Sequence, residues 1–317
     1  MSARPSCGRS WRALSNGAPS PASVLPQPQD RGQPALRGHF EGEFLAGLRD
    51  LGYIDGKSIE IEFRFTGGDP ERLAGAAADL ASENVDIIVT YASGITAARR
   101  ATSTIPIVMA TGSDIVAMGL AASLAHPGGN VTGSNFFLPE LMAKRLQLLK
   151  EVLPSMSRAG VLFLRGAAAT PNILEVMDAA AKALSLDLSP IEVSGPEEFE
   201  RAFSSWAEQK VSAVVVLDIF TTLSPAIAAL AAKYRFASIG RLELATAGGL
   251  IGYGVDFPPM YRRAALFVDK ILKGAKPGEI PIELATKFQT VVNLRTAKAL
   301  GLEIPPTVLA GAEEVIE

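Results

Sequence analysis

The sequence predicts an α/β fold made of two similar lobes, each with a parallel sheet flanked by helices. From residue 40 onward, short β-branched segments alternate with helical periods, a pattern typical of parallel sheets covered by helices. Residues 211–217 are almost entirely apolar, as expected for a strand buried on both faces. The alternation restarts after residue 133, and the 317 residues exceed the roughly 100–200 of a typical domain. Two lobes are therefore favoured over one long sheet.

In the first lobe, the helix at 40–52 has apolar residues on one face and ends at Gly52, as a left-handed C-cap would. The segment 59–65 alternates strictly between apolar and polar residues and predicts a strand. Asp69 and Pro70 are typical of the start of a helix. The expected elements are helix 40–52, strand 59–65, helix 70–84, strand 85–90, helix 95–101, strand 106–110, helix 115–124 and strand 131–133.

The second half repeats this alternation of helices and short strands. Its first helix, 138–153, has apolar residues at helical spacing, and the segments between the helices are short and apolar. The expected elements are helix 138–153, strand 158–164, helix 172–184, strand 187–193, helix 196–209, strand 211–217, helix 224–234, strands 237–240 and 250–254, helix 259–272, strand 288–293, helix 294–300 and a tail at 305–316.

Composition limits the classes of function. The chain is 48% apolar and 20% charged, which is enough for a core, and its net charge of −3 gives no basic stripe for nucleic acid. Cys7 is the one cysteine, and the two histidines, His39 and His126, are far apart. This pattern argues against a disulfide framework, a metal site and a Ser-His-Asp or Cys-His catalytic set. We expect no metal, no cofactor and no nucleic-acid partner.

The first 38 residues have a different character. They are rich in Pro, Ser, Gly, Arg and Gln, and they contain almost no branched apolar residues. Such a segment buries too little apolar surface to offset the entropy lost on ordering, so residues 1–38 are predicted to be disordered. They also lack the apolar stretch of about 7–15 residues found in a secretory signal.

Polar and aromatic side chains follow nearly every predicted strand. In open parallel sheets, ligands bind beyond the carboxyl ends of the strands, so these residues are the expected ligand contacts. They are Tyr91, Ser93, Gly94, Thr96, Thr111, Asp114, Asn135, Phe136, Arg165, Asn172, Asp218, Phe220, Gly254 and Asp256.

These residue types suit a small polar ligand. Ser93, Gly94 and Thr96 lie where a helix begins, and free N–H groups there favour a carboxylate. The aspartates could bind an ammonium group, and the aromatic side chains could enclose an apolar body. For each residue taken alone there is a simpler explanation, because Ser, Thr, Asp and Asn after strands commonly cap helices and aromatic residues pack cores.

Several catalytic motifs are missing from the sequence. It has no GxGxxG after the first strand, no GxxxxGK[ST] phosphate loop and no GxSxG elbow. Binding without chemistry is therefore the simpler interpretation. An enzyme that uses Asp218 or Asp256, such as a small α/β hydrolase or isomerase, remains an alternative.

Specific strings resemble a known family. FLAGLRDLGYIDG at 44–56 resembles the opening helix of the tryptophan-type substrate-binding proteins of ABC transporters, which have the periplasmic-binding-protein type 1 fold. Further similar strings follow in the same order. They are IEIEFR (59–64), TIPIV (104–108), GLAASLAHPGGNVTG (119–133), KRLQLLKEVLP (144–154), GGLIGYG (248–254), YRRAALFVDKILKGAKP (261–277) and TKFQTVVNLRTAKALGLEI (286–304).

The resemblance implies two Rossmann-like lobes joined by three chain crossings, with a ligand in the cleft between them. Lobe 1 would comprise residues 39–133 and 257–285, and lobe 2 residues 134–256 and 286–317. The implied function is that of a solute receptor for an ABC importer. The receptor would be a periplasmic monomer that binds an amino acid or related carboxylate and docks on a membrane permease. A ligand-sensing regulatory domain of the same fold is the alternative.

The sequence departs from this family at one place. Family members have an apolar first strand before the helix that matches 40–52, whereas no apolar run precedes His39. We therefore expect the first strand of lobe 1 to be missing. The composition break near Gly38 suggests an incorrect start site or reading frame upstream, and the chain as written would stay in the cytoplasm.

Overall fold

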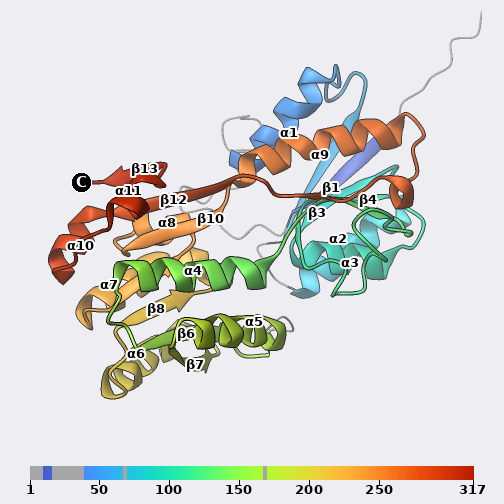
Figure 1. Ribbon diagram of the computed structural model, residues 1–317. Coiled ribbons are helices and arrows are strands. Elements are labelled where there is room, and N and C mark those ends of the chain that lie inside the picture. Colours follow the sequence, from blue (N-terminus) through green and yellow to red (C-terminus); the bar gives the residue numbers. More distant parts are fainter. Residues whose placement is uncertain (1–9, 16–38, 67–69, 167–169) are drawn as a thin grey trace, which may run out of the picture. The chain divides into compact units, whose positions relative to one another are not determined.

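The computed structural model describes residues 10–15, 39–66, 70–166 and 170–317 (Figure 1). The chain divides into two compact units. Unit 1 takes in the chain up to Phe136 and Asp256–Thr286, and unit 2 takes in Phe137–Val255 and Lys287–Glu317. The chain passes between the units three times, and these boundaries differ from the predicted ones by one to three residues.

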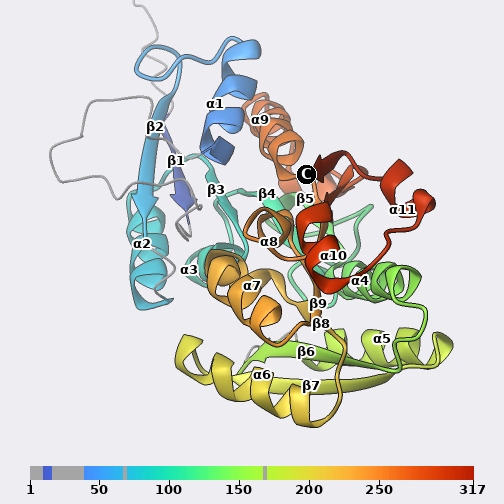
Figure 2. The same cartoon turned by 90° about the vertical axis from the view of Figure 1, so that its left-hand side faces the viewer.

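Unit 1 contains a six-stranded sheet in the order β11-β5-β4-β3-β1-β2, in which every paired neighbour is parallel. The strands are β1 (Ser10–Ser15), β2 (Glu60–Phe65), β3 (Ile88–Tyr91), β4 (Ile107–Ser113), β5 (Val131–Phe136) and β11 (Glu283–Leu284). Helices α1 (His39–Asp50) and α9 (Phe257–Leu272) lie side by side on one face, and α2 (Pro70–Ser82) and α3 (Ser93–Ala101) lie on the other (Figure 2).

The sheet of unit 1 contains a strand that the sequence did not predict. β1 pairs in parallel with β2 over its whole length and with β3 through Arg12 and Ala13. The expectation of a missing first strand is therefore wrong, and residues 10–15 of the segment predicted to be disordered are extended. Ladder pairing uses backbone groups that any extended segment offers, so an apolar run was not required. The rest of residues 1–38, including Cys7, lies outside the described residues.

The ends of β4 and β5 also differ from the prediction. Both strands continue past their apolar segments, β4 to Ser113 and β5 to Phe136, through an irregular register between Met109 and Gly112. The predicted helix at 115–124 does not form. Residues 115–119 are a turn, and Gly119 (φ 68°) has a left-handed backbone conformation that interrupts a helix.

Unit 2 contains a seven-stranded sheet in the order β13-β12-β10-β9-β8-β6-β7. The strands are β6 (Arg158–Leu164), β7 (Asp187–Val193), β8 (Ala213–Val216), β9 (Ala237–Gly240), β10 (Ile251–Val255), β12 (Phe288–Asn293) and β13 (Glu314–Ile316). The sheet is parallel, as predicted, except at one pair, where β12 runs antiparallel to β10. β10 leaves the unit at the same end at which β12 enters it, so the two strands must run in opposite directions.

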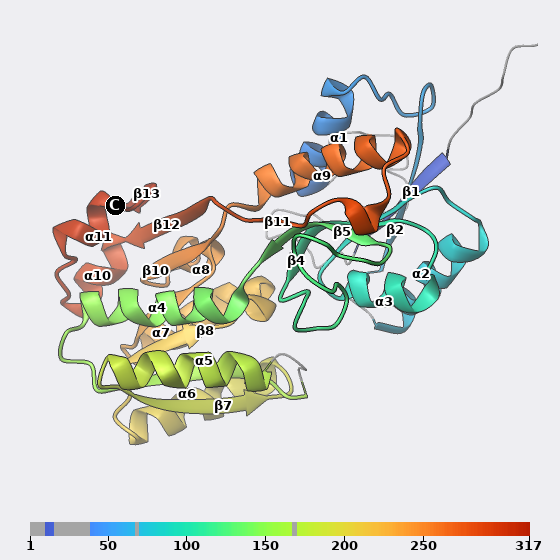
Figure 3. The ribbon, with the colours of Figure 1, turned by 45° about the vertical axis from the view of Figure 1, so that its right-hand side comes forward.

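Helices cover both faces of this sheet. The helices are α4 (Leu138–Val152), α5 (Thr170–Ala183), α6 (Phe199–Glu208), α7 (Ser224–Lys233), α8 (Leu242–Thr246), α10 (Leu294–Leu300) and α11 (Pro306–Ala310). α4 and α5 lie side by side on one face (Figure 3), and α6, α7 and α8 lie on the other (Figure 2). The core between these layers contains Trp206, whose indole N–H donates a 3.0 Å hydrogen bond to the Ser189 carbonyl.

No helix within the described ranges combines the length and the apolar character that crossing a membrane would require.

A glycine allows close packing between α1 and α9. A Cβ atom at Gly47 would lie 2.6 Å from the Arg262 carbonyl oxygen and 2.9 Å from the Ala265 Cβ. Arg262 also forms ion pairs across this contact with Glu43 and Asp50. The backbone of α1 at Gly47 therefore lies directly against α9, and only glycine fits at this position.

We expect Gly47→Ala to lower the free energy of unfolding by about 1–3 kcal/mol, because the clash involves backbone that cannot move freely. Gly75→Ala is the matched control, since Gly75 lies in α2 of the same unit with nothing within 4 Å of the added Cβ. That change should stabilise by about 0.5–1 kcal/mol through helix propensity. Urea unfolding of both variants measures the contrast, and a stabilised Gly47→Ala would contradict the packing described here.

Candidate functional site

A buried arginine lies at the carboxyl ends of β8 and β10 in unit 2. Arg145, in α4, has 0% of its side chain exposed. Its Nε donates a hydrogen bond to the Tyr253 carbonyl at 2.8 Å, and its Nη1 donates to the Val216 carbonyl at 3.0 Å. Nη1 also lies 2.6 Å from the Asp218 Oδ1. One cation therefore connects a helix, two strand ends and a carboxylate.

Burial lowers the pKa of Arg145, and the Asp218 carboxylate opposes this effect by favouring the charged guanidinium. A buried cation without a counter-charge is strongly unfavourable, so Asp218 compensates for the burial of Arg145. The Asp218 side chain is 18% exposed although its Oδ1 is enclosed. The exposure therefore belongs to the rest of the side chain, which includes Oδ2.

The local sequence places Asp218 at the end of the sheet. β8 ends at Val216, and a 3₁₀ turn over Asp218–Leu223 follows it directly. The Thr221 hydroxyl donates to the Asp218 carbonyl at 2.6 Å and closes this turn. The carboxylate is thus held at the carboxyl end of a central strand, where ligands of parallel sheets bind.

The other predicted residues of unit 2 have different surroundings. Gly254 lies beside the buried cation, because a Cβ atom there would be 3.7 Å from the Arg145 Nη2. Phe220, which was also predicted to contact ligand, is buried and packs against the edge of Phe199. Arg165 forms an ion pair with Glu198 at 3.6 Å, and Asn172 is exposed on α5. The structure thus groups Asp218 and Gly254 around Arg145.

In unit 1, the predicted residues after β3 lie at the start of a helix. Ala92 has φ 48° and ψ −128°, a strained conformation for a residue other than glycine, and α3 begins at Ser93. Ser93 is exposed, Gly94 is buried and Thr96 is half-buried. The helix N-terminus therefore lies at the carboxyl end of β3, where its N–H groups favour an anion.

Aromatic side chains accompany the strand ends of unit 1. Tyr91, at the end of β3, packs edge-on against Tyr261 of α9, with ring centroids 5.8 Å apart. Phe136, at the end of β5, packs against Phe257 at 5.6 Å. Both predicted aromatic residues thus lie between the sheet and α9.

Asn135 is the most enclosed of the predicted residues in unit 1. Its side chain is fully buried in β5, and its Oδ1 accepts a 3.3 Å hydrogen bond from the Ile115 N–H. Its Nδ2 has no hydrogen-bond partner in the described part of the chain. The Asn135 oxygen thus holds the loop after β4 through the backbone N–H of Ile115.

The remaining predicted residues surround this loop. Thr111 is buried in β4, and its carbonyl accepts a 3.3 Å bond from the Ala92 N–H. Asp114 turns the chain with φ 51° and donates its N–H to the Phe136 carbonyl at 3.3 Å. Asp256 precedes α9, and its side chain makes no capping hydrogen bond.

Reasoning from the sequence missed Arg145. The signal was present, because position 145 falls on the buried face of α4 with Leu141, Met142 and Leu149. A charged residue on an apolar helical face indicates a buried ion pair or a functional site. Its partner, Asp218, was identified.

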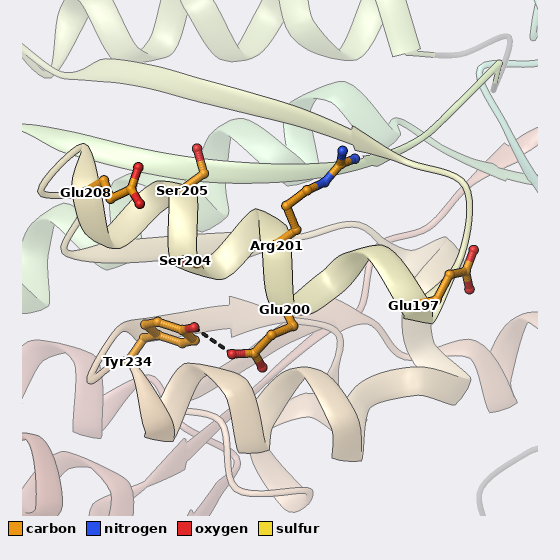
Figure 4. A pocket seen from close by; sticks show the side chains of 7 residues that line it. All are labelled: Glu197, Glu200, Arg201, Ser204, Ser205, Glu208 and Tyr234. Atoms are coloured by element: carbon orange, nitrogen blue, oxygen red, sulfur yellow. Dashed lines mark hydrogen bonds between the residues drawn. The ribbon is translucent and has the colours of Figure 1, made fainter.

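Figure 4 shows a separate pocket of about 500 Å³ on the surface of α6. Its lining consists of Glu197, Glu200, Arg201, Ser204, Ser205, Glu208 and Tyr234. Glu200 accepts a 2.6 Å hydrogen bond from the Tyr234 hydroxyl and pairs with Lys233, and Arg201 pairs with Glu198. Glu200 and Arg201 thus already have partners and the pocket lies open on the surface, so we assign it no ligand. Across the described residues, no three or more His, Cys, Asp or Glu side chains are grouped to hold a metal ion.

Residues 32–316 match the sequence profile of the family described as ABC transporter substrate binding protein. The chain belongs to this family. A tyrosine-binding protein from Clostridioides difficile is 27% identical to this substrate-binding protein over 263 residues, which cover 82% of this chain and 76% of the relative. The family predicted from the sequence is thus confirmed.

Solved structures share the fold. An ABC domain in complex with L-Trp from Streptococcus pneumonia aligns with a TM-score of 0.83 at 23% identity, covering 98% of this chain and 100% of the other. A conserved domain protein from Vibrio cholerae aligns with a TM-score of 0.83 at 25% identity, covering 97% and 99%. The predicted periplasmic-binding-protein type 1-like α/β fold is confirmed.

Replacing Asp218 with alanine should lower the free energy of unfolding of unit 2 by about 3 kcal/mol, because the Arg145 cation loses its counter-charge inside the protein. Asp187→Ala is the matched control, since Asp187 pairs with Arg158 on the surface of the same unit. That control should leave stability nearly unchanged.

The double variant Arg145→Met with Asp218→Ala should recover most of the loss, because it removes both charges. Guanidinium unfolding of the three variants measures these differences. An equal loss in the single and double variants would show that the ion pair is not the cause.

Proposed function

We propose that this substrate-binding protein is a receptor for an aromatic amino acid, which it delivers to an ABC permease in the membrane. The observation that carries the proposal is the Asp218 carboxylate, held at a strand end by the buried Arg145 with its side chain partly exposed. An anchored carboxylate at this position suits an ammonium group, which is common to all amino acids.

Unit 1, taken by itself, also has groups that suit parts of an amino acid. The N-terminus of α3, with Ser93 exposed, suits the ligand carboxylate. Tyr91 and Phe136 lie at neighbouring strand ends and suit an aromatic side chain. The relatives support this ligand class, because one is named as a tyrosine-binding protein and a structural neighbour is a complex with L-Trp.

The proposal includes binding without chemistry. Family membership places the chain among proteins that bind and hand over a solute, so we assign no catalytic role to Asp218 or Asp256. We also propose that the protein works outside the cytoplasm and docks on a permease, and its family membership supports both.

A thermal-shift panel tests the ligand class. At 100 times its dissociation constant, a ligand of the folded state adds about 2.7 kcal/mol of stability. We expect L-tyrosine or L-tryptophan to raise the melting temperature and D-glucose to leave it unchanged. A chain stabilised by none of the aromatic amino acids, even at millimolar concentration, would not be an aromatic amino-acid receptor.

A charge placed at the start of α3 tests the carboxylate subsite. Ser93→Asp should weaken binding of L-tyrosine by about tenfold or more, because like charges would meet where the helix N-terminus favours the ligand carboxylate. Ser103→Asp makes the same substitution at an exposed position just past the other end of α3. Isothermal titration should show wild-type affinity for that control, and equal weakening in both variants would remove the subsite from the proposal.

A further inference from the structure

Burying the charged Arg145 side chain costs free energy that an apolar residue at the same position would not. Buried ion pairs are often no more stabilising than apolar residues of the same size. The residues around Arg145 on the buried face of α4 are Leu141, Met142, Leu146 and Leu149, so a methionine or leucine would suit the packing there. The guanidinium therefore calls for an explanation other than stability.

The hydrogen bonds of Arg145 show where it acts. Nε and Nη1 donate to the carbonyls of Tyr253 and Val216, which lie near the ends of β10 and β8. β9 lies between these two strands in the sheet, so the guanidinium bridges across the end of a third strand. Its contact with Asp218 comes from the same Nη1 that is fixed on Val216. The planar fork thus sets the position of Oδ1 relative to two rigid strands.

Anchoring one oxygen has a consequence for the other. Oδ1 is enclosed against Arg145, so the rotation of the carboxylate about its Cβ–Cγ bond is restricted. Oδ2 is the remaining charged acceptor of a side chain that is 18% exposed. A fixed acceptor of this kind binds a cationic amine without losing side-chain entropy on binding. It therefore favours a ligand that carries the amine over one that lacks it.

We propose that Arg145 is a positioning residue that sets specificity for ligands with an ammonium group, by holding Asp218 with one oxygen inward and the other toward the ligand. The proposal rests on the proposed function, because it requires an amino-acid ligand. It adds that discrimination for the amine depends on a residue that the ligand does not touch, because the Arg145 side chain has no exposed surface.

The test compares two ligands that differ only in the amine, L-tyrosine and 3-(4-hydroxyphenyl)propionate. Wild type should bind L-tyrosine about tenfold to hundredfold more tightly, the range expected for one charge-assisted hydrogen bond. Arg145→Met should reduce this ratio to near one, with the affinity for the propionate changed by less than about twofold. A structural role alone would weaken both ligands together and leave the ratio unchanged.

Two further variants complete the experiment. Arg145→Lys keeps the charge but lacks the fork, so it should give an intermediate ratio, and it carries the test if Arg145→Met does not fold. Arg158→Met is the matched control, because Arg158 pairs with Asp187 on the surface of the same unit, and it should keep the wild-type ratio.

The outcomes separate the two proposals. If wild type binds neither L-tyrosine nor L-tryptophan, the proposed function is wrong and the role of Arg145 is overturned with it. If wild type binds L-tyrosine and the propionate equally, the receptor function stands but the amine specificity is wrong. If the ratio survives in both Arg145→Met and Arg145→Lys, Arg145 is not a positioning residue.

Discussion

The carboxyl end of the sheet in unit 2 depends on one buried positive charge. The Arg145 guanidinium binds the Val216 carbonyl at the end of β8, the Tyr253 carbonyl of β10 and the Asp218 carboxylate. Each of these groups would otherwise require a partner at a strand end, where the ladder no longer supplies one. Electrostatic contacts to Arg145 therefore join the sheet, the turn after β8 and the first helix of the unit at the place where the apolar core ends.

In unit 1, the chain at the carboxyl ends of the strands is directed by backbone conformation. Ala92 and Asp114 have positive φ angles directly after β3 and β4, and Gly133 has a φ of 136° within β5, where a Cβ atom would meet the Met109 backbone. These turns direct the chain at the carboxyl ends of the strands without a buried charge. Strain of this kind persists only where surrounding structure over-determines it, and it is concentrated at functional sites.

Much of the fold could be predicted because periodicity reports which residues face a core. The alternation in 59–65 and the apolar segment at 211–217 correspond to β2 and β8. The failures lie where local pattern carries no information. β1 forms through backbone pairing in a segment without an apolar run, and the direction of β12 is set by which end of the sheet the chain re-enters. The helix expected at 115–124 had the composition of a helix but not its backbone conformation.

The candidate site was predictable to a similar extent and for a related reason. Strand-end position predicted that Asp218 and Gly254 lie close together, because parallel strands present their carboxyl ends together, and both lie beside Arg145. It could not separate Asp218 from Phe220, two residues further on, which turns into the core. Nor could it find Arg145, which comes from the middle of a helix and reaches the strand ends only in three dimensions.

The discontinuous arrangement of both units affects how the chain can fold during synthesis. α1 packs on α9, and the Tyr53 hydroxyl reaches Asp269, 216 residues later in the chain. The sheet of unit 2 in turn includes β12, which follows α9 in the chain. Neither unit can close its sheet and helical layers until most of the chain has left the ribosome, and contacts of such long range form slowly. The nascent chain therefore exposes the apolar side of α1 for most of its synthesis, a period in which a chaperone could bind it.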